Sequence, residues 1–93
     1  MGKIIITVLG KDTVGIIAKV CTYLAGSNIN ILDINQTIVQ DYFNMMMIAD
    51  MSGTDKPLEE VMADLDRIGA EIGVNIRVQR EEIFTSRHRI LER

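Results

Sequence analysis

Apolar positions along the first third of the chain change from a strand pattern to a helix pattern. Residues 3–9 (KIIITVL) form a nearly continuous, β-branched apolar run, which predicts a central strand covered on both faces. A helix is predicted to start near Val14 and to end at Gly26 with a left-handed C-cap. Its apolar positions recur at helical spacing: Ile16, Ile17, Val20, Cys21 and Leu24.

The rest of the chain repeats this alternation. Residues 29–40 and 43–51 predict two strands joined by a tight turn at Asp41 and Tyr42. Pro57 falls in the first turn of a second helix, and Gly73 is its predicted C-cap. The apolar stripe of that helix is Leu58, Val61, Met62, Leu65, Ile68 and Ile72. A fourth, half-exposed strand follows, with apolar residues at Val74, Ile76 and Val78.

The resulting order, β-α-β-β-α-β, predicts an α+β, ferredoxin-like fold with an antiparallel sheet. Right-handed crossovers place both helices on one face of that sheet. The other face would then be bare, although the third strand presents Met46 and Ile48 there. Residues 83–93 contain Ile83, Phe84, Ile90 and Leu91 at helical spacing. We therefore expect residues 1–82 to form the domain and residues 83–93 to form a helical extension that packs on the sheet or on a partner.

Composition limits the classes of function. The 93 residues suffice for one domain with a small core, which favours oligomerisation. A net charge of −3 argues against nucleic-acid binding, and no apolar run is long enough to span a membrane. One cysteine excludes an internal disulfide, and no leader is visible, so we expect a cytoplasmic protein. The single histidine, His88, offers no cluster for a metal, and no cofactor is expected.

Two polar segments are the candidate site. Gly10-Lys11-Asp12-Thr13-Val14-Gly15-Ile16 lies between the first strand and the first helix, where free backbone N–H groups would stabilise a carboxylate. Asp12 could accept a hydrogen bond from an ammonium group. Asn28-Ile29-Asn30-Ile31 opens the second strand, and the amide of Asn30 offers donors and an acceptor. Together the segments indicate a site for a zwitterion such as an amino acid.

This pattern, Gly10-x-Asp12-x-x-Gly15-Ile16, helix, Gly26-x-Asn28-Ile29-Asn30-Ile31, strand, resembles the ACT-domain family from residue 3 to about residue 80. It is similar to small stand-alone ACT proteins and to the ACT domains of formyltetrahydrofolate deformylase and the glycine-cleavage regulator. The resemblance implies a regulatory domain that acts in trans on a metabolic enzyme or regulator. It also implies a homodimer paired through the second strands. The implied ligand site combines Asp12, Val14, Gly15 and Ile16 of one chain with Asn30 of the other.

Plainer explanations exist for these residues. Asp12 and Thr13 are ordinary helix-capping types, and Asn28 fits a left-handed turn. Cys21 is expected to be a small buried apolar residue with a structural role. The alternative function is a docking or dimerisation module without a ligand.

Two further classes are disfavoured. An enzyme would need a nucleophile beside an oriented base, and nothing in the chain supports one. RNA-recognition modules of similar topology need stacking aromatic residues, where this chain has Ile4-Ile5-Ile6.

Overall fold

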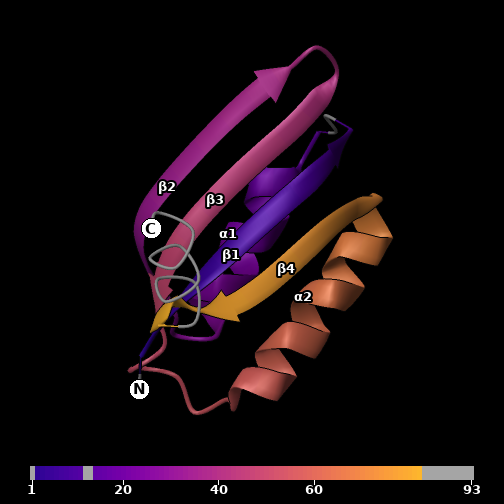
Figure 1. Ribbon diagram of the computed structural model, residues 1–93. Coiled ribbons are helices and arrows are strands. Elements are labelled where there is room, and N and C mark those ends of the chain that lie inside the picture. Colours follow the sequence, from indigo (N-terminus) through magenta and orange to yellow (C-terminus); the bar gives the residue numbers. More distant parts are fainter. Residues whose placement is uncertain (1, 12–13, 83–93) are drawn as a thin grey trace.

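The structure is a computed structural model and describes residues 2–11 and 14–82. It contains a four-stranded antiparallel sheet with two helices on one face, as the sequence predicts (Figure 1). The elements are β1 (Lys3–Lys11), α1 (Ile16–Gly26), β2 (Asn30–Val39), β3 (Tyr42–Asp50), α2 (Leu58–Ile72) and β4 (Val74–Arg80). The predicted β-α-β-β-α-β order is confirmed.

The strands lie in the order β2-β3-β1-β4, so β1 is central and β2 is an edge strand. Ile6 of β1 pairs with Met47 of β3 on one side and with Val78 of β4 on the other. The β2–β3 pairing shifts register between Ile31 and Asp33. From that shift onward, Ile34 and Ile38 oppose Met47 and Phe43 and lie on the helix side of the sheet.

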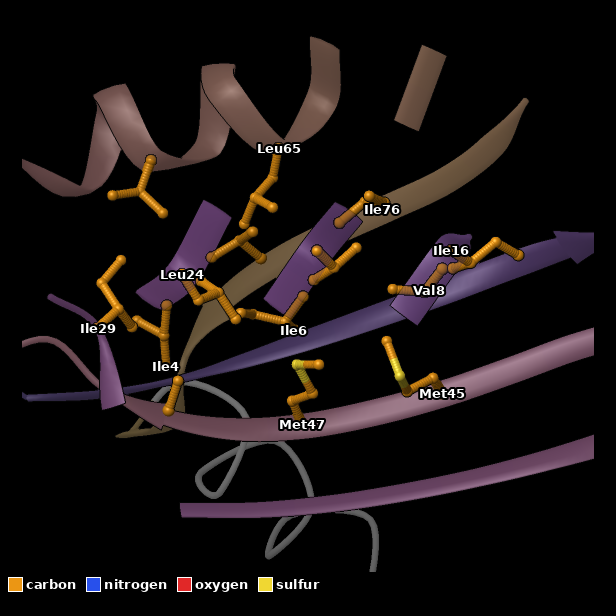
Figure 2. Packing of buried hydrophobic residues seen from close by; sticks show 14 of the residues in the cluster. Ile4, Ile6, Val8, Ile16, Leu24, Ile29, Met45, Met47, Leu65 and Ile76 are labelled. Atoms are coloured by element: carbon orange, nitrogen blue, oxygen red, sulfur yellow. The ribbon is translucent and has the colours of Figure 1, made fainter. Parts of the chain in front are cut away.

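The core lies between the sheet and the two helices (Figure 2). Each helix contributes one stripe of residues spaced by four, because that spacing returns to the same side of a helix. The buried residues of these stripes are Ile16, Val20 and Leu24 on α1, and Val61, Leu65 and Gly69 on α2. A Cβ on Gly69 would lie 2.7 Å from the carbonyl oxygen of Val74, so the glycine lets α2 approach β4 closely.

The ends of α1 differ from the prediction. The helix begins at Ile16, two residues later than expected, and Gly26 is its last helical residue. The predicted left-handed C-cap at Gly26 is wrong, because the C-cap is Ser27 with φ −99°. The left-handed conformation that the sequence also predicts for Asn28 is confirmed, with φ 61°. The backbone N–H of Ile29 then donates back to the carbonyl of Leu24 at 2.9 Å. For α2, the left-handed C-cap at Gly73 is confirmed, with φ 84°.

The hairpin between β2 and β3 is shifted by one residue from its predicted position. The turn consists of Gln40 and Asp41, and Tyr42 already belongs to β3. Gln40 adopts φ 57°, a left-handed conformation that a non-glycine residue rarely takes.

The second face of the sheet, opposite the helices, is only partly buried. Ile5 on this face is 4% exposed, but Leu9, four residues further along β1, is 55% exposed. The prediction that this strand is covered on both faces is therefore correct near its start and wrong near its end. Met46 is 40% exposed, and the predicted extension at 83–93 lies outside the described residues.

Candidate functional site

The connection from β1 to α1 provides no capping side chain among the residues that the structure describes. Gly15 is the N-cap, with φ 94°, and a glycine has no side chain that could accept hydrogen bonds from the first N–H groups. The first turn of α1 contains no acidic residue. The hydrogen bond from the Lys19 N–H to the Gly15 carbonyl, at 2.9 Å, is the first of the helical series. The N–H groups of the preceding residues have no acceptor within the helix, so this end of α1 suits an anion.

The predicted site residues of this connection have different surroundings. Val14 is 99% exposed, whereas Ile16 is 2% exposed and belongs to the core. Ile16 can therefore offer a ligand its backbone N–H but not its side chain. A Cβ added to Gly15 would meet nothing within 4 Å, so the space beside the helix start is open. Asp12 lies outside the described residues.

Asn30 is exposed and is the first residue of β2. It lies at the end of α1 opposite to Gly15, and the eleven residues of α1 correspond to a helix about 16 Å long. One chain therefore does not bring Asn30 together with the β1–α1 connection. Asn30 instead borders a hollow of about 400 Å³ between α1 and β2, lined by Cys21, Ala25, Asn28, Ile29, Asn30 and Ile31.

The side of the domain formed by α1 and β2 carries several exposed apolar side chains. Ile17, Cys21 and Ala25 follow one another at a spacing of four, so they share one side of α1. Beside them, Ile34 and Ile38 on the helix-side face of β2 are 42% and 57% exposed. We call the surface formed by these five residues the α1–β2 surface.

Cys21 is half-buried within the α1–β2 surface and packs against the core. Burial raises the pKa of its thiol above the ordinary value of 9.0, which keeps the thiol protonated at neutral pH. This agrees with the structural role expected from the sequence.

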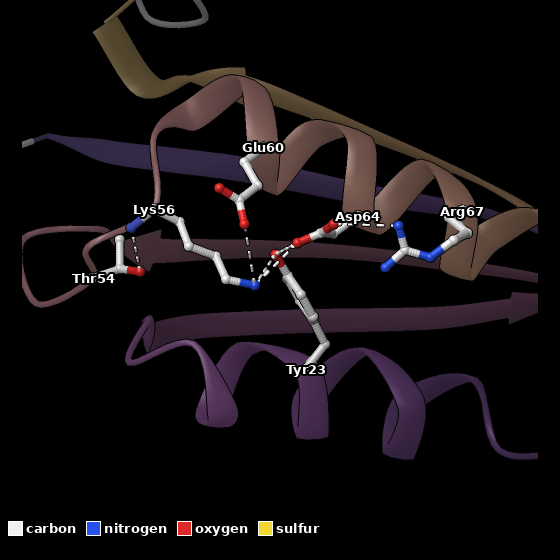
Figure 3. Close-up of polar contacts among 6 residues, drawn as sticks. All are labelled: Tyr23, Thr54, Lys56, Glu60, Asp64 and Arg67. Carbon is white, nitrogen blue, oxygen red and sulfur yellow. Dashed lines mark hydrogen bonds and ion pairs between the residues drawn. The ribbon is translucent and has the colours of Figure 1, made fainter.

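A polar cluster joins α1 to α2 on the outer side of the helix layer (Figure 3). The Tyr23 hydroxyl donates to Asp64 Oδ2 at 2.6 Å, and Lys56 Nζ donates to the same oxygen at 3.1 Å. Lys56 Nζ also lies 4.7 Å from the centre of the Tyr23 ring, and Arg67 Nη1 is 3.3 Å from Asp64 Oδ1. The hydrogen bond from Tyr23, followed by that from Lys56, lowers the pKa of Asp64 below its ordinary value of 3.8.

The cluster has no appearance of a reaction site. Tyr23, Lys56 and Arg67 all contact the Asp64 carboxylate, whose side chain is 14% exposed. Lys56 Nζ also lies 3.9 Å from Glu60 Oε2 and donates to the Tyr23 hydroxyl at 3.4 Å, so the charged groups of the cluster are paired with one another. Sequence reasoning missed the cluster because residues 23, 56 and 64 are far apart and Tyr23 lies outside the apolar stripe of its helix.

Two classes of site are not found in the part of the chain that the structure describes. Residues 2–11 and 14–82 contain no group of three or more His, Cys, Asp or Glu side chains placed to hold a metal ion. Neither helix within these ranges has the length and hydropathy required to cross a bilayer.

Comparison with known proteins decides the family. The profile of the ACT domain matches residues 3–79. The chain belongs to the ACT-domain family. A UPF0237 protein of Bifidobacterium longum is 60% identical over 90 residues, which cover 97% of this chain and 100% of that protein.

Solved structures agree with this assignment. An ACT domain protein from Streptococcus pneumoniae has a TM-score of 0.78 and 36% identity, over 88% of this chain and 92% of that one. The fold is shared with a formyltetrahydrofolate deformylase from Pseudomonas syringae pv. tomato (TM-score 0.78, 20% identity) and a glycine-cleavage regulator (0.74, 22%). These alignments cover 86% and 84% of this chain but 28% and 44% of the other two.

A further neighbour is a regulatory subunit. The regulatory subunit of aspartate kinase from Thermus thermophilus has a TM-score of 0.64 and 25% identity, over 85% of this chain and 51% of that one.

Proposed function

We propose that this ACT domain is a regulatory module that binds a small zwitterion, an amino acid, and acts in trans on a metabolic enzyme or regulator. The observation that carries the proposal is the start of α1 at Gly15, where no described side chain caps the helix and a Cβ would meet nothing within 4 Å. The carboxylate of an amino acid would accept hydrogen bonds from the backbone N–H groups at this helix start. Asp12, in the same connection, would accept from the ammonium group.

The second half of the proposed site comes from a partner chain. Lys11 at the end of β1 pairs with Tyr42, which pairs with Val39 at the end of β2. The β1–α1 connection is therefore at the end of the sheet where β2 finishes. If two β2 strands pair antiparallel about a two-fold axis, the start of the partner's β2 lies at that same end. Asn30 of the partner subunit would then approach the connection that its own chain keeps distant.

The α1–β2 surface supports such a homodimer. It combines an edge strand, whose outer N–H and C=O groups have no partner within the described sheet, with exposed apolar side chains on both elements. A second copy of the same surface would cover both. Regulation in trans is supported by the neighbour that is a regulatory subunit. The proposal assigns the domain no catalytic step.

A second candidate function is a docking or dimerisation module that takes no ligand. Two observations favour it: Val14 is 99% exposed beside the helix start, and the β2 edge is apolar and open. In this case Val14 and the α1–β2 surface would contact protein only.

A thermal-shift screen against the common amino acids, followed by calorimetry, distinguishes the two functions. A ligand that binds only the folded state at a hundred times its Kd adds about 2.7 kcal/mol to the free energy of unfolding. The ligand-binding proposal expects such a shift with at least one amino acid. If none raises the melting temperature, while light scattering still shows a dimer, the docking function is the correct one. Salt-dependent retention on a nucleic-acid column would contradict both.

A further inference from the structure

The second face of the sheet is covered at one end only. Ile5 and Ile48, which pair across β1 and β3, lie near the start of β1 on this face. Ile5 is 4% exposed, and Ile48 is half-buried. Further along the same face, Met46 is 40% exposed and Leu9 is 55% exposed. Neighbours within a sheet stand beside a side chain and do not lie over it. Both helices are on the opposite face, so neither provides the cover over Ile5 (Figure 1).

We propose that residues 83–93 lie across this end of the sheet and bury Ile5 and Ile48 of their own chain. The place where the described chain ends supports this occupant. Gln79 and Arg80 at the end of β4 pair with Ile5 and Ile4 of β1. The next two residues, Glu81 and Glu82, are already helical. The first of the remaining eleven residues is therefore four positions after Gln79, the residue that pairs with Ile5.

The length of the segment fits the width of the face. An eleven-residue helix is about 16 Å long. From β4 across β1 and β3 to β2 there are three strand spacings, or about 14 Å. A helix that starts at β4 therefore reaches the far edge strand when it crosses the sheet.

The composition of the segment fits what it would meet. Ile83, Phe84, Ile90 and Leu91 supply apolar side chains for Ile5 and Ile48. On β2, Asp33 pairs with Ile48 and marks the far edge of the covered area with a negative charge. The second half of the segment has a net positive charge, with Arg87, Arg89 and Arg93 against Glu92, so opposite charges would meet there.

The cover would leave the other end of the face open. That end has a hollow of about 360 Å³, lined by Thr7, Leu9, Asn44, Asn75 and Arg77. Contacts of this face with other proteins would thereby be confined to the hollow and its surroundings. This inference does not depend on whether the domain binds an amino acid.

Fluorescence of a single tryptophan tests the proposal in the full-length chain. The sequence contains no tryptophan, so Phe84→Trp introduces the only one. We expect its emission to be blue-shifted relative to the same variant in denaturant, and we expect acrylamide to quench it weakly. Emission equal to that of the unfolded chain, with a native circular dichroism spectrum, would overturn the proposal.

Two charge substitutions locate the cover. Adding Ile48→Asp to Phe84→Trp places a carboxylate under the segment, so we expect emission to shift to the red and quenching to rise toward the denatured value. Leu9→Asp places the same charge at the open end of the same face and should change neither. An equal response to both substitutions, or no response to Ile48→Asp, would mean that the segment lies elsewhere.

Dilution and truncation separate the remaining occupants. A cover supplied by the same chain is unimolecular, so emission should stay constant when light scattering shows dimers dissociating. A red shift that follows dissociation would assign the segment to the partner's sheet and contradict the proposal. Truncation after Glu82 should lower the melting temperature by exposing Ile5, and an unchanged melting temperature would show that another occupant provides the cover.

Discussion

At the scale of single residues, Gly15 is required by its backbone conformation. Its φ of 94° is accessible to glycine at little cost, whereas a Cβ is strained there although it meets no atom. We expect Gly15→Ala to lower the free energy of unfolding by about 1–2 kcal/mol. Gly26→Ala is the matched control, because Gly26 is helical and also meets nothing within 4 Å. It should raise stability by about 0.5–1 kcal/mol, the difference in helix propensity. Urea unfolding measures both, and equal effects would contradict this explanation.

Asp12 carries the residue-scale prediction for the ligand. If an amino acid binds at the start of α1, Asp12→Ala should weaken its binding by about 1.5–3 kcal/mol, the scale of a hydrogen bond to a charged group. Asp41→Ala, in the β2–β3 turn, removes the same charge from the chain and should leave the affinity unchanged. Calorimetry with the best ligand from the screen measures both. Equal weakening would indicate an effect of net charge and no contact with Asp12.

At the scale of elements, the Tyr23–Lys56–Asp64 cluster ties α1 to α2 and makes stability depend on pH. The pKa of Asp64 is lowered in the folded state, so the folded protein favours the carboxylate. The contribution of the Asp64 carboxylate to the free energy of unfolding is fully present above its unfolded pKa, near 3.8. This contribution is lost as the pH falls through the lower pKa of the folded state. We expect the stability of Asp64→Asn to lack this acid-induced loss, so that the free energies of unfolding of wild type and variant converge at low pH. Asp66→Asn, on the same helix but outside the cluster, should keep the wild-type dependence. Denaturant unfolding between pH 7 and pH 2 measures the difference.

The elements also show what a sequence can predict. Hydrophobic period and glycine placement predicted the four strands and two helices of the described residues, because β-branched runs and apolar stripes spaced by three or four are typical of these elements. These patterns did not predict the exact ends of α1. At its C-terminal end, hydrogen bonds donated by the backbone N–H groups of residues 27–29 decide which residue adopts the left-handed conformation. The patterns also gave no sign of the Tyr23 cluster, which depends on the way two helices lie side by side. The candidate site at the start of α1 is a prediction from the sequence, whereas the hollow beside Cys21 and Ala25 depends on the packing of α1 against β2 and had no sequence signal.

At the scale of the whole molecule, the asymmetry of the surface decides what the domain can join. One edge of the sheet, β4, is packed against α2 through Gly69 and Val74, whereas β2 at the other edge carries exposed isoleucines beside a helix that does not cover them. In the described part of the chain, a helix therefore packs closely on the β4 side of the sheet, whereas the isoleucines on the β2 side remain exposed. A ligand site that needs Asn30 from a second copy depends on that open side.

The dimer is therefore the prediction on which the proposed site depends. Ile34 on β2 and Met62 on α2 are both 42% exposed, but only Ile34 belongs to the α1–β2 surface. We expect Ile34→Lys to give a monomer at micromolar concentration, because two charges would have to be buried in a symmetric interface. Met62→Lys adds the same charge at an equally exposed position outside the α1–β2 surface, so this variant should remain a dimer. Light scattering decides between them. A monomeric wild type would contradict the dimer itself, and a dimeric Ile34→Lys variant would move the interface away from β2. In either case Asn30 would lose its route to the start of α1.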